Sequence, residues 1–74
     1  MNDEKFEKYK QLKLDLEKQE NLLSIFKNNE HSIYFTQRGN SYSMVKSDEL
    51  FFRKTMIARI SDRIFHLKKK IEEL

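Results

Sequence analysis

The sequence predicts a mostly helical α+β fold, an antiparallel two-helix coiled-coil hairpin with a two-stranded β-hairpin between the helices (α-β-β-α). Two stretches carry apolar residues at alternating spacings of three and four, and a short alternating segment with a Gly-Asn pair separates them. Residues at that period form one narrow apolar stripe on a helix, and such a stripe needs a partner to bury it. The 74 residues are expected to form a single domain, 1–74.

The first helix is predicted over residues 3–27. Asn2 is suited to cap its start, because an Asn side chain can accept a hydrogen bond from a free N–H group of the first turn. Asp3 and Glu4 then lie at the positive end of the helix dipole, and Asn28 and Asn29 interrupt the pattern at the other end. The stripe consists of Tyr9, Leu12, Leu16, Gln19, Leu23 and Phe26.

The β-hairpin is predicted over residues 32–46, with strands at 33–37 and 42–46 that are rich in β-branched and aromatic residues. Gly39, the only glycine, can supply the positive φ that a two-residue type II′ loop at Gly39-Asn40 requires. Phe35 then pairs with Met44, and one face of the hairpin is apolar. Because a lone hairpin is marginally stable in water, this face is expected to pack on the helix ends or on another hairpin. The face consists of Ile33, Phe35, Tyr42 and Met44.

The second helix is predicted over residues 48–73, with Ser47 as its N-cap, the acids Asp48 and Glu49 in its first turn and cations near its end. A short connection makes the helices antiparallel, which places Phe26 near Leu50 and Leu16 near Ile60. The stripe consists of Leu50, Arg53, Ile57, Ile60, Ile64, Leu67, Ile71 and Leu74.

Charged and polar residues in and beside the two stripes indicate how the two helices are aligned along each other. Opposite charges flank the seam at Asp15 and Arg63, and again at Glu20 and Lys54. Gln19 and Arg53 interrupt the two stripes. A polar seam residue typically fixes the register of the helices, and a ligand contact is the alternative.

The surplus of apolar residues predicts an interface. Phe51, Ala58 and Phe65 recur every seven residues and form a second stripe on the second helix, which a two-helix hairpin does not need. With Tyr34 and Phe35 of the hairpin, they are the candidate contacts for a protein partner or a second copy. We expect a homo-oligomer, most simply a dimer whose four helices share one core, because so small a chain buries little surface by itself.

Basic residues form a second candidate surface, spaced four, three and four apart along the second helix: Arg59, Arg63, His66 and Lys70. Such a ridge can bind phosphates or an acidic protein surface. The alternative is a solvated helix face partly neutralised by acids of the first helix.

Other classes of function are disfavoured. The chain has no cysteine, and His31 and His66 are too few for a metal site, so no metal or cofactor is expected. No phosphate loop or nucleophile motif occurs, so we do not expect an enzyme. No targeting segment or membrane span is visible, which favours the cytoplasm. The abundance of Lys, Asn, Ile and Phe favours a low-GC bacterium or its phage as the source.

These features predict a small protein-interaction module that binds and modulates a larger protein, for example as an inhibitor, and that self-associates through its helices. A nucleic-acid-binding accessory protein that uses the basic ridge is the alternative.

Overall fold

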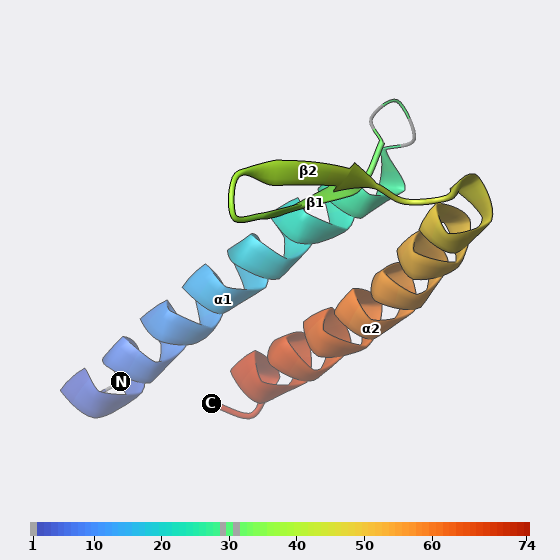
Figure 1. Ribbon diagram of the computed structural model, residues 1–74. Helices are drawn as coiled ribbons and strands as arrows, with labels where there is room; N and C mark the ends of the chain where they lie inside the picture. The colour runs from blue at the N-terminus through green and yellow to red at the C-terminus, as the bar shows by residue number, and fades with distance from the viewer. Residues whose placement is uncertain (1, 29, 31) are drawn as a thin grey trace.

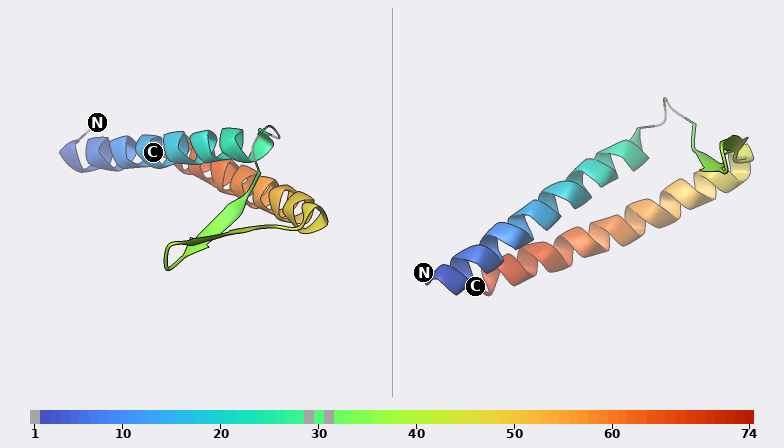
Figure 2. Two further views of the ribbon diagram at one scale, coloured as in Figure 1. Left: turned by 45° about the horizontal axis from the view of Figure 1, so that its top comes forward. Right: turned by 60° about the vertical axis from the view of Figure 1, so that its left-hand side comes forward.

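The computed structural model describes residues 2–28, 30 and 32–74, and it has the predicted α-β-β-α order (Figure 1). The two helices run antiparallel, with both chain termini at one end of the pair and the β-hairpin at the other (Figure 2). The elements are α1 (Asp3–Lys27), β1 (Tyr34–Gln37), β2 (Asn40–Ser43) and α2 (Lys46–Glu72).

The core lies between the helices and follows the predicted stripes. Leu16 of α1 packs against Ile60 and Ile64 of α2, and Ile60 is completely buried. Partly buried apolar residues extend this core in both directions: Leu22, Leu23, Phe26, Met56, Leu67 and Ile71. The core is therefore one thin apolar layer along an elongated molecule of 50 × 26 × 16 Å.

The prediction that Leu50 belongs to the apolar stripe buried between the helices is wrong, because its side chain is 58% exposed. A straight helix turns about 100° per residue, so Leu50 lies about 80° away from Ile60, whereas Glu49 lies within about 20° of it. Glu49 accordingly takes the buried place, and the ring that lies beside Phe26 is that of Phe52, at a centroid distance of 5.7 Å.

The two helix starts differ. Asn2 caps α1 as predicted, since its side-chain oxygen accepts the Lys5 N–H at 2.8 Å. The prediction that Ser47 caps α2 is wrong: the N-cap is Val45, without a side-chain hydrogen bond, and Ser47 lies in the first turn. The helix begins earlier because the Val45 carbonyl already accepts the Glu49 N–H, at 2.8 Å.

The hairpin forms with a different loop and register from those predicted. Phe35 pairs with Tyr42 rather than with Met44, and Gln37 pairs with Asn40. The loop is therefore Arg38-Gly39, and both residues have positive φ, 51° and 80°, as a type I′ turn requires. The register differs by two residues, so the predicted apolar face is preserved, since side chains alternate with a period of two.

The hairpin projects from the helices as a separate ribbon (Figure 2). The helices contact each other and the strands contact each other, but every residue of the two strands is exposed. The expected packing of the hairpin face on the helix ends is therefore incomplete. Ile33 and Met44 are half-buried, whereas Phe35 and Tyr42 remain 56% and 50% exposed.

Candidate interaction surfaces

The second stripe of α2 lies on the side of the helix that faces away from α1. Phe51 is 73% exposed and Phe65 is 60% exposed, and Ala58 between them is exposed as well. Ile60 and Ile64, by contrast, are buried against α1. A contact through the stripe would therefore build a second apolar layer, not the single four-helix core that the sequence suggested.

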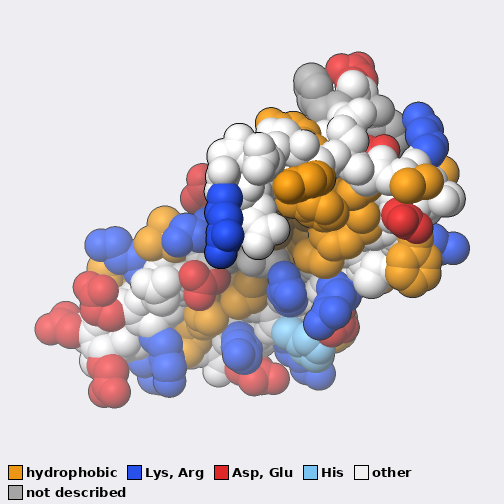
Figure 3. All heavy atoms as spheres, in the orientation of Figure 1, with side chains coloured by type: hydrophobic (Ala, Val, Ile, Leu, Met, Phe, Trp, Pro, Cys, Tyr) orange, Lys and Arg blue, Asp and Glu red, His pale blue; other side chains and the backbone are white. Residues whose placement is uncertain are grey.

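The hairpin carries the other exposed aromatic residues. Tyr34 is 61% exposed and Phe35 is 56% exposed. Tyr34 also lines a mostly apolar groove of about 350 Å³ between the hairpin and the helices, with Leu22, Ile25 and Phe52 among its other walls. Apolar side chains gather in this region of the surface (Figure 3). Aromatic side chains above an apolar groove are typical of protein-binding surfaces.

The basic ridge forms one wall of a second groove, of about 360 Å³, between the two helices. The structure brings Arg63, His66 and Lys70 together there, and Lys18 of α1 joins them from the opposite wall. Cationic side chains are visible along this part of the surface (Figure 3). Arg59 is exposed but does not line the groove, so three of the four predicted ridge residues share one site.

The polar residues of this groove are not fully paired. Asp15 and Arg63 both line it, but within the described part of the chain they form no ion pair, and neither do Glu20 and Lys54. Gln19 also lines the groove, and its buried Oε1 atom has no hydrogen-bond partner among the residues described. The predicted flanking ion pairs therefore do not fix the helix alignment.

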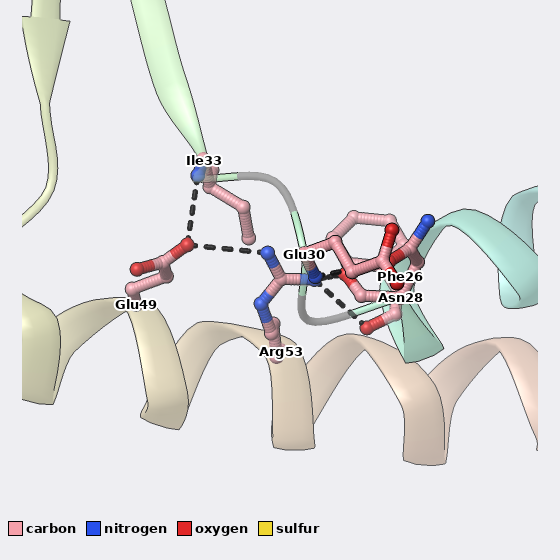
Figure 4. A network of polar contacts seen from close by, with 6 residues as sticks. All are labelled: Phe26, Asn28, Glu30, Ile33, Glu49 and Arg53. Carbon is pink, nitrogen blue, oxygen red and sulfur yellow. Dashed lines mark hydrogen bonds and ion pairs between the residues drawn. The ribbon is translucent and has the colours of Figure 1, made fainter.

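A buried polar network joins the helices at the hairpin end (Figure 4). Arg53 is 7% exposed, and its Nη1 donates to the main-chain oxygens of Phe26, at 3.0 Å, and Asn28, at 2.8 Å. Its Nη2 lies 3.2 Å from Oε1 of Glu49, which also accepts the Ile33 N–H at 2.8 Å. Arg53 thus binds carbonyl groups at the C-terminal end of α1, which supports the predicted role of this polar residue in fixing the alignment of the helices.

Hydrogen bonding lowers the pKa of the Glu49 carboxyl below its ordinary value. The main cause is the N–H group of Ile33, and the Arg53 guanidinium adds to it, while burial acts in the opposite direction. Glu49 is therefore a charged anchor of the hairpin.

Two contributors were missed by sequence reasoning. Glu49 was interpreted only as a first-turn acid, although its spacing of four residues from Arg53 is that of a helical ion pair. Lys18 was not singled out, because its approach to Arg63 depends on how the two helices pack. His31 lies outside the described residues.

Among the residues that the structure describes, no group of three or more His, Cys, Asp or Glu side chains is placed to hold a metal ion. Neither helix, within that same part, contains a stretch long and apolar enough to cross a membrane. Comparisons with protein-family models, curated proteins and solved structures found no match to this chain.

Proposed function

We propose that this protein is a small, non-enzymatic, cytoplasmic interaction module that binds and modulates a larger protein and self-associates through its helices. The observation that carries the proposal is the exposure of aromatic residues on two separate surfaces, the α2 stripe and the hairpin. Phe51 and Tyr34, one from each surface, are both more than 60% exposed. Exposed aromatic clusters of this kind mark interaction sites.

The total surface supports the same proposal. The chain exposes 6423 Å², whereas a compact monomer of its mass, 9.1 kDa, exposes about 4,900 Å². The surplus of roughly 1,500 Å² exceeds the ~800 Å² that one partner contributes to a standard interface. A partner, a second copy or both could cover it.

The hairpin is the surface that we assign to the larger partner. Phe35 and Tyr42 pair across the strands and are both at least half exposed, so they present one aromatic pair to solvent. Exposed Arg59 and Arg63 would orient an acidic partner surface, since charge complementarity contributes more to orientation than to affinity.

Affinity capture from the native host with Phe35→Ser as the variant tests this assignment. Thr36→Ala, on the polar face of the same strand, is the matched control. We expect the wild type and the control to retain a defined protein, and the variant to bind it at least ~30-fold more weakly, as for a hot-spot residue. Equal binding by all three proteins, or no protein above background, would count against the proposal.

Nucleic-acid binding is the second candidate, and the groove lined by Lys18, Arg63, His66 and Lys70 favours it. Binding through phosphates releases counterions, so affinity should fall steeply between about 50 and 200 mM salt. Fluorescence anisotropy with mixed DNA and RNA decides the question. Arg63→Glu should abolish binding, with Glu20→Lys as a charge-changing control on another face. Absence of binding at low salt would exclude this candidate.

A further inference from the structure

The α2 stripe has an internal symmetry that its exposure alone does not reveal. Ala58, the only alanine of the chain, lies seven residues after Phe51 and seven residues before Phe65. Seven residues are nearly two turns, so the three side chains point the same way, with the two rings about 21 Å apart along the axis. Two large apolar side chains therefore flank one small residue at equal distances.

We propose that the α2 stripe packs against the same stripe of a second copy, with the two α2 helices antiparallel about a twofold axis at Ala58. The proposal rests on the self-association proposed above and names its contact. In this arrangement Phe51 of each copy meets Phe65 of the other. Ala58 meets Ala58, and its small side chain allows the helices to approach closely at the axis.

Charges on the same face support the antiparallel arrangement. Lys54 and Asp62 each lie four residues from Ala58, at about 40° on either side of it. The twofold axis therefore sets Lys54 of each copy at the height of Asp62 of the other, across the width of the stripe, so that opposite charges face each other at both heights. A parallel arrangement would set Lys54 against Lys54 and Asp62 against Asp62, which is repulsive. The charge pattern thus selects one of the two symmetric arrangements.

The exposure of the α2 stripe is consistent with a second copy as its occupant. Phe51 and Phe65 are the most exposed phenylalanines of the chain, and the contact between Oδ1 of Asp62 and Nε2 of His66, at 3.5 Å, is solvent-exposed. Asp62 can therefore turn to a new partner at little cost. Over the whole chain, the surplus of roughly 1,500 Å² is larger than the ~800 Å² that one side of a standard dimer contact requires.

Charge reversal and mixing test the contact, with sedimentation velocity as the readout. Lys54→Glu alone and Asp62→Lys alone each create two repulsive pairs, and we expect each to weaken self-association about tenfold. An equimolar mixture of the two variants should recover wild-type association, because both pairs become attractive again in the mixed dimer. Lys10→Glu and Glu20→Lys, exposed residues of α1 with the same charge changes, are controls that should leave association unchanged.

Cysteine crosslinking provides an independent readout, since the chain has no native cysteine. Ala58→Cys should form a disulfide-linked dimer on mild oxidation, and Glu20→Cys should not. A wild-type chain that sediments as a monomer at tens of micromolar would overturn self-association and this contact together. Self-association that is unaffected by the charge variants, without preferential crosslinking at Ala58, would overturn this contact only and leave self-association in place.

Discussion

Glu49 and Arg53, one turn apart on α2, form a buried ion pair at 3.2 Å that joins three segments of the chain. Glu49 accepts the Ile33 N–H group at the start of the hairpin, and Arg53 donates to carbonyl oxygens at the end of α1. The apolar core consists of only a few residues, so this network has a large share in holding the hairpin end together.

Arg53→Met should therefore lower the free energy of unfolding by about 2–4 kcal/mol, because it leaves the Glu49 carboxylate unpaired and two carbonyl groups without their donor. Arg59→Met, an exposed arginine on the same helix, is the control and should change stability by less than about 0.5 kcal/mol. Urea unfolding followed by circular dichroism measures both. Equal effects of the two substitutions would show that the network does not stabilise the fold.

The lowered pKa of Glu49 predicts acid sensitivity. A carboxyl group with a folded-state pKa below its unfolded value, about 4.5, contributes stability above that pH and loses it as the pH falls through the folded-state pKa. The melting temperature should therefore decrease as the pH falls below about 4.5. This decrease should be smaller in the Glu49→Gln variant, which has no carboxyl group to protonate at that position. Melting curves between pH 3 and 7 test the expectation, with exposed Glu20→Gln as control. An identical pH profile of Glu49→Gln and wild type would refute it.

The turn offers a local test. Arg38 has a φ of 51°, which is unfavourable for a side chain other than Gly, Asn or Asp. Arg38→Asn should stabilise the hairpin by about 0.5–1 kcal/mol, since Asn-Gly is the preferred type I′ pair. Gly39→Ala should destabilise it by about 1–2 kcal/mol through backbone strain alone, because no atom lies within 4 Å of the added Cβ.

Amide hydrogen exchange at residues 34–43 measures both effects. Because every residue of the two strands is exposed and the helices pack mainly on each other, exchange in α1 and α2 should stay unchanged. A change that extends through both helices would show that the hairpin and helices unfold as one unit.

The sequence was informative where local rules decide the structure. The heptad stripes predicted the helix pairing, and the positions of Leu16 and Ile60 in the core followed from them. The alternation of the strands predicted which residues share the apolar face of the hairpin. These features depend on the helical and strand periods, which a single sequence displays.

The predictions that were wrong concern positions where the sequence pattern alone does not determine the structure. Leu50 and Glu49 are adjacent, and only one of them can be buried against α1. Glu49 is the buried residue because α2 is a straight helix and because its carboxylate accepts a hydrogen bond from the Ile33 N–H group. The loop is Arg38-Gly39, with positive φ at both residues, whereas the sequence pattern indicated only Gly39 as a residue suited to positive φ. For the candidate sites, sequence spacing found the stripe and most of the basic ridge, but Lys18 reaches the groove only through helix packing.

Because Ile60 is buried and Leu50 is exposed, the structure predicts that truncating these two side chains of similar size has different effects on stability. Ile60→Ala should cost about 2–4 kcal/mol, because this side chain is fully buried and its removal leaves a cavity. Leu50→Ala should cost less than about 1 kcal/mol, since that side chain is mostly exposed. Thermal unfolding of both variants makes the comparison. A larger effect at Leu50 would restore the uninterrupted heptad alignment.

Gln19 provides the last test, because its Oε1 atom is buried without a hydrogen-bond partner among the described residues. A buried polar atom without a partner costs stability, whereas an apolar group of similar shape does not. Gln19→Met, which is nearly isosteric, should therefore raise the free energy of unfolding by about 1 kcal/mol. Asn21→Met, at an exposed position of α1, is the control for helix propensity and should have a smaller effect. A loss of stability in Gln19→Met alone would mean that the amide makes a hydrogen bond in solution, most simply to the cations of the basic groove.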